Sequence, residues 1–214
     1  MKAVIFDMDG LMVDSERLYF QSEREIARKF GKEVKDETLW RMMGRKPVES
    51  LALFARELEL PVTAEELFIM RTEIMRRRLK EDLQPMPGLF SVIDALYGKV
   101  KLSVATGAQK EFMDIIVDTL NLRTKFDVLQ ASDDIRQGKP DPEIYLVTCR
   151  KLRVEPKDSV VLEDSLNGVI AGYRAGCYVI AVPSEYTKNH DLSLADYKAK
   201  DLFEAGRHIL QILN

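Results

Sequence analysis

The sequence has few of the residues on which disulfide scaffolds and histidine-dependent chemistry rely. Its 214 residues include two cysteines, Cys149 and Cys177, which do not form a CxxC pair. Two such cysteines cannot build a disulfide framework, so we expect a protein of a reducing compartment. The two histidines, His190 and His208, are too few for a histidine zinc site or a Ser-His-Asp triad. Neither lies in a motif, so we expect both at the surface or packed against helices.

The sequence also lacks an excess of either charge and any long apolar segment. Its 32 Lys and Arg residues against 35 Asp and Glu residues give a net charge of −3. This balance excludes the global positive field that nucleic-acid and membrane-surface binding need. No apolar run approaches the roughly 18 residues of a membrane span, and the opening MKAVIFDMDG is too short and too acidic for a signal peptide. We therefore expect a cytoplasmic protein without nucleic-acid or membrane partners.

Alternating strand and helix patterns fill most of the chain. At about 150 residues per domain, this length indicates one domain, or one domain with a sizeable insertion. Short apolar runs predict strands at 2–7, 100–105, 126–131, 159–163 and 177–182. Helical spacing predicts helices at 89–97, 109–120, 142–152 and 166–175. This order is typical of a doubly wound, Rossmann-like α/β core, in which helices cover both faces of a mostly parallel sheet.

A purely helical segment interrupts this alternation. Between 16 and 82 the apolar spacing predicts three helices, of which the second opens at Pro47 and the third follows Thr63 as its N-cap. A lone N-terminal strand needs the later strands as partners. We therefore expect residues 1–15 and 83–214 to form one core, and residues 16–82 to be an inserted, mobile α-helical cap domain.

Polar side chains follow the ends of four predicted strands. In an open parallel sheet, ligands bind beyond the carboxyl ends of the strands. Only the last predicted strand delivers no acid, hydroxyl or amine there. Taken singly, each polar group has a plain structural interpretation as a turn former, a helix cap or a solvated lysine. Their convergence at one edge favours a common site, made of Asp7 and Asp9, Thr106 and Gly107, Lys139, and Glu163 with Asp164.

The charges at this edge predict the chemistry. Several carboxylates repel one another unless a cation joins them, and oxygen ligands without His or Cys indicate Mg²⁺, with Mn²⁺ or Co²⁺ as substitutes. Asp7 could attack phosphorus and form an aspartyl phosphate once the metal and Lys139 neutralise the phosphate. Asp9 could protonate the leaving oxygen and later deprotonate water. Thr106 and the amides after it, beginning at Gly107, could hold phosphate oxygens at a helix N-terminus.

Four segments of the chain resemble the motifs of the haloacid dehalogenase superfamily: FDMDGLMVDSE, VATGA, GKPDPEIY and VLEDSLNGVIAGYRAG. More narrowly, they are similar to those of the phosphatases and phosphomutases grouped around β-phosphoglucomutase. The likeness runs from Ala3 to about Pro183 and keeps the spacing of all four motifs. It implies that the helical segment is a cap that excludes water and selects the substrate. Relatives of this size that carry a cap are often monomers, and the sequence leaves the oligomeric state open.

The resemblance also assigns roles to the residues of the common site. It implies Asp7 as the nucleophile and Asp9 as the general acid and base. It implies Thr106 and Lys139 as the pair that binds phosphate. The Mg²⁺ ligands that it implies are the side chains of Asp7 and Asp164 and the backbone carbonyl of Asp9, with Glu163 as a lesser candidate.

The cap bears on the choice between hydrolysis and phosphoryl transfer. β-Phosphoglucomutases carry a histidine on the first cap helix and an arginine in a cap loop. Here Tyr19 takes the place of the histidine, and the arginine position falls near Pro47, just after Arg45 and Lys46. Tyr19, Trp40, Arg45 and Lys46 are therefore candidates for substrate contact, although packing within the cap is the commoner role for Tyr19 and Trp40.

The departure from the mutase pattern favours hydrolysis. We expect a Mg²⁺-dependent phosphatase, a phosphoric monoester hydrolase, that acts with broad specificity on small phosphorylated metabolites and above all on sugar phosphates. The first alternative is a sugar phosphomutase of the β-phosphoglucomutase type, and the second is a non-catalytic phosphate-binding module. Dehalogenation is disfavoured, because it needs no Mg²⁺ and would leave Glu163 and Asp164 without a cation.

Overall fold

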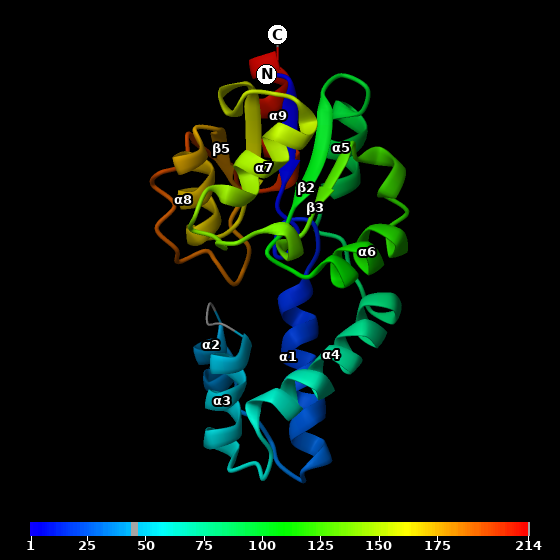
Figure 1. Cartoon of the computed structure of the whole chain (residues 1–214), viewed down its shortest axis with the longest axis vertical. Helices are drawn as coiled ribbons and strands as arrows, with labels where there is room; N and C mark the ends of the chain where they lie inside the picture. The colour runs from blue at the N-terminus through cyan, green and yellow to red at the C-terminus, as the bar shows by residue number, and fades with distance from the viewer. Residues whose placement is uncertain (44–46, 214) are drawn as a thin grey trace. The chain divides into compact units, whose positions relative to one another are not determined.

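The computed structural model describes residues 1–43 and 47–213, which divide into two units. The core unit comprises Met1–Asp14 and Gln84–Asn214, and the helical unit comprises Ser15–Leu83. The two units have different secondary structure, and Figure 1 shows strands in the first and helices in the second. We describe each unit by itself.

The sheet of the core unit is parallel at every pairing between described strands. Its spatial order is β3-β2-β1-β4-β5-β6, so the direction of strand addition reverses between β1 and β4. This is the order of doubly wound nucleotide-binding folds, in which ligands bind at such a reversal. The strands are β1 (Ala3–Phe6), β2 (Lys101–Ala105), β3 (Val128–Gln130), β4 (Ser159–Glu163), β5 (Tyr178–Ala181) and β6 (Tyr197–Lys198).

The pairing register places the ends of the three central strands at the same level. Phe6 lies opposite Val104 of β2 and Leu162 of β4. The next residue of each of these three segments therefore lies at the same edge of the sheet. Those residues include Asp7 and Glu163, which come from segments of the chain far apart in sequence.

Helices cover the sheet because its strands are apolar on both faces. Ala3 and Ile5 belong to a buried cluster with residues of α7 (Glu143–Leu152) and α8 (Leu166–Ala175), while Val4 and Phe6, which point the other way, are also fully buried. The remaining helices of the core unit are α5 (Leu89–Leu96), α6 (Lys110–Thr119) and α9 (Leu202–Leu213). Of these, α5 and α9 pack against each other.

The predicted α/β class, with its helical insertion, is confirmed, and five of the described strands fall within or beside the predicted ranges. Two elements of this unit, β6 and α9, were not predicted. Two residues of strand are too few to show a period, but α9 carried a signal, because Asp201 accepts a hydrogen bond from the amide of Glu204 at its first turn. Short 3₁₀ helices complete this unit: η1 (Arg123–Lys125), η2 (Ser132–Asp134) and η3 (Pro156–Asp158).

Both histidines of the sequence lie in the core unit. The ring of His208 on α9 stacks on Tyr197 with 3.7 Å between ring centroids, and its Nε2 lies 3.0 Å from the hydroxyl of Tyr178. His190 is exposed, and its Nδ1 accepts a hydrogen bond from the amide of Leu166. The expectation of packed or surface histidines is therefore confirmed.

In its described residues, the helical unit has four helices around an apolar cluster: α1 (Ser15–Lys29), α2 (Asp36–Met42), α3 (Pro47–Leu58) and α4 (Ala64–Glu81). Thr63 caps α4 as predicted, because its hydroxyl accepts from the amide of Glu66 and the Glu66 carboxylate accepts from the amide of Thr63. The sequence analysis did not predict α2, which buries only a short apolar pair, Leu39 and Met42.

None of the described helices is both long and apolar enough to span a membrane.

Candidate active site

Asp7 begins a tight loop at the carboxyl end of β1. Its amide donates to the carbonyl of Leu162, which extends the pairing with β4 by one residue, and its side chain is buried. The chain then turns within residues 8–13, where the amide of Gly10 donates to the carbonyl of Val13 at 2.9 Å. Gly10 has φ +79°, and a Cβ there would lie 2.4 Å from Oδ2 of Asp164. Glycine therefore allows this loop and the end of β4 to approach each other.

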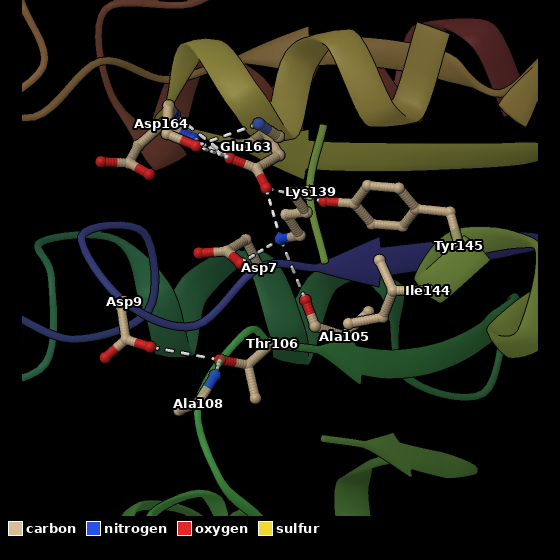
Figure 2. A network of polar contacts seen from close by, with 12 residues as sticks. Asp7, Asp9, Ala105, Thr106, Ala108, Lys139, Ile144, Tyr145, Glu163 and Asp164 are labelled. Atoms are coloured by element: carbon tan, nitrogen blue, oxygen red, sulfur yellow. Dashed lines mark hydrogen bonds and ion pairs between the residues drawn. The ribbon is translucent and has the colours of Figure 1, made fainter. Parts of the chain in front are cut away.

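Lys139 joins the ends of β1 and β4. Its Nζ donates to Oδ1 of Asp7 and to Oε1 of Glu163, each at 2.5 Å, and to the carbonyl of Ala105 at 3.3 Å (Figure 2). Burial lowers the pKa of Lys139, but the two carboxylates outweigh it and hold that pKa well above its ordinary value. The lysine is therefore a fixed positive charge within the site.

Both oxygens of Glu163 have hydrogen-bond donors. Besides Lys139, Oε1 accepts from the hydroxyl of Tyr145 at 2.7 Å. Oε2 accepts from the amides of Asp164 and Ser165, each at 3.1 Å, and from Oγ of Ser165 at 3.0 Å. Burial would raise the pKa of Glu163, but Lys139 and these donors hold it below its usual value. Glu163 is therefore a buried carboxylate with fully committed oxygens.

A glycine of α8 makes room for this carboxylate. A Cβ at Gly168 would lie 1.8 Å from Oε1 of Glu163, so no other residue fits there without moving the glutamate. The amide of Gly168 itself donates to Oγ of Ser165, which caps the helix. The first turn of α8 thus determines where Glu163 lies.

Asp164 is held by the loop that follows β5. Its Oδ2 accepts from Oγ of Ser184 and from Oγ1 of Thr187, each at 3.2 Å. Both hydroxyls follow β5, so the expectation that the last predicted strand delivers no polar group to this edge was wrong. Ser184 stands only two residues after that predicted range, and the signal was therefore present. Burial, reinforced by the charge of Glu163, raises the pKa of Asp164 to about 7.

Asp9 and Thr106 meet on the other side of Asp7. The hydroxyl of Thr106 donates to Oδ2 of Asp9 at 3.1 Å and accepts from the amide of Ala108 at 3.0 Å (Figure 2). Thr106 is completely buried, so its hydroxyl has a fixed position. Gly107 lies between Thr106 and Ala108, and a Cβ there would meet no atom within 4 Å.

The buried carboxylates can accommodate a divalent cation. One oxygen each from Asp7, Glu163 and Asp164 lies within 4.8 Å of the other two. Burial first, and then the charge of Glu163, raise the pKa of Asp7 well above its ordinary value. Three buried carboxylates against one lysine leave an excess of negative charge that a cation would offset. The donor set, which is all oxygen, fits Mg²⁺, with Asp7 and Asp164 better placed than the committed Glu163.

The predicted cap residues belong to the helical unit. Tyr19 lies on α1, and the guanidinium carbon of Arg71 stands 5.3 Å from the centroid of its ring. Trp40 is 45% exposed and makes an edge-to-face contact with Phe20 at 5.7 Å between centroids. Arg45 and Lys46 lie outside the described residues.

Comparisons with known proteins give consistent likenesses. The sequence pattern of the family described as haloacid dehalogenase-like hydrolase matches residues 4–182. The chain is 38% identical over 208 residues to the phosphorylated carbohydrates phosphatase of Thermotoga maritima. The aligned region covers 96% of this chain and 92% of that protein. It is 28% identical over 180 residues to the fructose-1-phosphate phosphatase of Escherichia coli, over 84% of this chain and 95% of that protein.

One similar solved structure comes from Thermotoga maritima, and its name suggests a beta-phosphoglucomutase. It has a TM-score of 0.88 and 32% identity to this chain, and the match covers 100% of both chains.

Proposed function

Because this chain belongs to the haloacid dehalogenase-like hydrolases, we propose that it is a Mg²⁺-dependent phosphatase of small phosphorylated metabolites, and of sugar phosphates above all. One observation carries the proposal. Lys139 holds Asp7 and Glu163 at 2.5 Å each, at the point where the strand order reverses. A nucleophile beside a fixed cation suits attack on a phosphate dianion. The phosphatase names of two relatives support this assignment.

We assign the covalent step to Asp7. Its Oδ1 is held by Lys139, so Oδ2 is the oxygen that attacks phosphorus. A bond forms between Oδ2 and phosphorus while the bond from phosphorus to the ester oxygen breaks. Asp9 donates a proton to that leaving oxygen. In the second step Asp9 takes a proton from water, the water oxygen bonds to phosphorus, and the bond to Asp7 breaks to release inorganic phosphate.

The phosphate group needs positive charge and donors in this site. Lys139 supplies the charge, and the Thr106 hydroxyl with the nearby amide of Gly107 supplies the donors, since the amide of Ala108 already donates to Thr106. When bound, Mg²⁺ would supply further neutralisation of the phosphate, held by the carboxylates of Asp7 and Asp164 and by the Asp9 carbonyl.

Glu163 and Tyr145 serve as positioning residues in this proposal. Neither needs to touch the substrate, because both act through Lys139. Glu163 accepts from Lys139 and Tyr145, and the lysine Nζ lies 5.0 Å from the centroid of the tyrosine ring. They keep the ammonium charged and directed at Asp7.

We assign the role of a cap to the helical unit, within the expected bounds 16–82. Its four helices form their own apolar cluster, so this part of the chain is a separate body of structure. A body of that kind can exclude water from a phosphoryl-aspartate and can select the organic part of the substrate.

The test is a screen of phosphate release from sugar phosphates, including those of erythrose, fructose, mannose, glucose and 2-deoxyglucose, and from glycolate phosphate. We expect activity with Mg²⁺ that is lost on chelation. In Asp7→Asn, kcat should fall at least about a thousandfold, because the amide is a poor nucleophile. Asp94→Asn is the matched control, since Asp94 is exposed and pairs only at the surface with Lys125. Full activity in Asp7→Asn would exclude the covalent mechanism.

The same screen separates hydrolysis from phosphoryl transfer, which the name of the similar Thermotoga maritima structure brings into question. Each sugar monophosphate is incubated with a labelled hexose bisphosphate. We expect the label to appear in inorganic phosphate. Retention of the label in a sugar product would favour the mutase instead.

A further inference from the structure

The loop that follows β5 continues beside the end of β4. The amide of Val182 donates to the carbonyl of Glu163 at 2.7 Å, which extends the pairing of the two strands by one residue. Ser184 and Thr187, further along this loop, are only 7% and 6% exposed. Buried hydroxyls need hydrogen-bond partners, and in this loop they find them in the candidate active site.

Ser184 and Thr187 form a closed turn. The amide of Ser184 donates to Oγ1 of Thr187 at 2.9 Å, and the amide of Thr187 donates to the carbonyl of Ser184 at 3.2 Å. The two hydroxyl oxygens lie 3.1 Å apart. Both contact the same atom, Oδ2 of Asp164, at 3.2 Å each. The turn therefore presents a pair of possible donors to one carboxylate oxygen.

The loop after β1 confines the same oxygen. A Cβ at Gly10 would lie 2.4 Å from Oδ2 of Asp164 and 3.4 Å from Oδ1. Oδ2 is thus in close contact with the Gly10 backbone as well as with the two hydroxyls. Because the bonds from Ser184 and Thr187 both end on Oδ2, Oδ1 is the oxygen that they leave for a cation.

The donors of Asp164 differ in charge from those of its neighbours. Asp7 and Glu163 each accept from the ammonium of Lys139 at 2.5 Å, whereas Asp164 accepts from neutral hydroxyls. Figure 2 shows the Asp164 carboxylate outside the network around Lys139. Neutral donors fix a carboxylate without cancelling its charge, so its attraction for a cation remains. One of its oxygens lies within 4.8 Å of oxygens of Asp7 and Glu163.

We propose that Ser184 and Thr187 are positioning residues that set the affinity of the site for Mg²⁺. They hold Oδ2 of Asp164, so that the carboxylate is already ordered before the metal binds. Hydrogen-bond partners of metal ligands typically change metal affinity about 10- to 100-fold. The inference rests on the proposed Mg²⁺-dependent function and adds to it two residues that lie outside the four motif segments.

The test measures the binding of Mg²⁺ alone to the metal-free full chain by titration calorimetry. In Thr187→Val, which keeps the shape of the side chain and removes the hydroxyl, the Kd for Mg²⁺ should rise at least about tenfold. In Ser184→Ala, which leaves the bond from Thr187 to Asp164, the Kd should rise less. Thr187→Ser keeps a hydroxyl and should bind within about threefold of the wild type. Thr124→Val, at an exposed position of η1, is the matched control and should not change the Kd.

A second measurement separates positioning from a purely structural role. The Mg²⁺ concentration that gives half of the maximal rate, with the best sugar phosphate of the screen, should rise in Thr187→Val by the same factor as the Kd. A purely structural role would lower kcat without moving that concentration, and this result would overturn the inference.

An unchanged Kd for Mg²⁺ in both Thr187→Val and Ser184→Ala would also overturn the inference, as would an equal weakening in Thr187→Ser. If Thr187→Val does not fold, Ser184→Ala decides alone. A wild type that binds no Mg²⁺ would exclude both the proposed metal dependence and this inference. If the wild type binds Mg²⁺, Thr187→Val weakens that binding and no substrate of the screen is hydrolysed, the proposed function fails and the inference stands.

Discussion

The core unit and the helical unit differ in how far their buried carboxylates are paired with hydrogen-bond donors. In the core unit, Lys139 lies between two carboxylates, and both oxygens of Glu163 have donors. In the helical unit, Glu23 is almost as deeply buried but has one long ion pair and, within the part of the chain that the structure describes, one oxygen without a donor. The chain itself therefore satisfies both oxygens of Glu163, whereas the described residues satisfy only one oxygen of Glu23. Glu163 is thus held in place by its surroundings, whereas Glu23 is a buried acceptor that the described residues satisfy only in part.

The largest effect should come from breaking the complete network. Lys139→Met leaves Asp7 and Glu163 buried without their cation, which should lower the free energy of unfolding by about 3–5 kcal/mol. The measurement is urea unfolding in the presence of a chelator, so that no metal replaces the lysine. Adding Glu163→Gln to this variant should recover part of the loss. Lys125→Met, which removes an exposed ion pair with Asp94, should cost less than about 1 kcal/mol. Equal losses in the two lysine variants would contradict the comparison.

The incomplete pair of the helical unit should show itself in the pH dependence of stability. The pKa of Glu23 is about 7 in the folded protein against an ordinary value of 4.5. A raised pKa means that the fold prefers the protonated form. The stabilisation of the fold by protonated Glu23 is therefore fully present below about pH 4.5. It is lost as the pH rises through about 7, and the total loss in unfolding free energy is about 3 kcal/mol.

This prediction is measured as the difference between the wild type and Glu23→Gln. The difference isolates Glu23 from other groups that titrate in the same range. Among the described residues, the charged groups around Glu23 are Arg71 and Arg24, which lower its pKa, and Glu16, which lines a pocket of the helical unit together with it. The wild type should lose stability relative to the variant between about pH 5 and about pH 8. Parallel pH curves for the two proteins would show that Glu23 is not a strained charge.

A smaller effect should sharpen the account of the core network. Gly168→Ala places a methyl group 1.8 Å from Oε1 of Glu163, so the carboxylate must leave Lys139. We expect a loss of about 2 kcal/mol in unfolding free energy, which is typical of overpacking. Gly138→Ala is the control for stability, because a Cβ there would meet no atom within 4 Å. Wild-type stability in Gly168→Ala would mean that the Glu163 side chain can adopt another position without loss of unfolding free energy.

The candidate-site residues at the carboxyl ends of the strands could be predicted from the sequence. Asp7, Glu163 and Asp164 stand at the ends of apolar runs, and parallel strands place their carboxyl ends at one edge. Lys139 lies in the loop that follows the third predicted strand. The resemblance that rested on these segments is confirmed by the matching family. The role of Tyr145 was not predictable in this way, because an aromatic residue on a helix facing a sheet is usually part of the core. Only its hydroxyl, 2.7 Å from Glu163, reveals a polar role.

The sequence could not predict contacts that depend on how helices pack. Glu23 and Arg71 are on different helices of the insertion, and each has an ordinary pattern of charged neighbours in sequence. Their pairing follows from the contact between α1 and α4, which periodicity alone does not orient. Arg45 and Lys46, by contrast, stay predictions because they lie outside the described residues.

The central place of β1 also has a consequence for how the protein forms. The strand pairs with β2, which begins at Lys101, and with β4, which begins at Ser159. During synthesis most of the chain must therefore emerge before β1 has both of its neighbours. The four helices of the insertion contact one another within Ser15–Leu83, and such local contacts form fast because little chain entropy is lost in closing them. The helical unit can thus assemble first on the ribosome, while Asp7 acquires its surroundings late in folding.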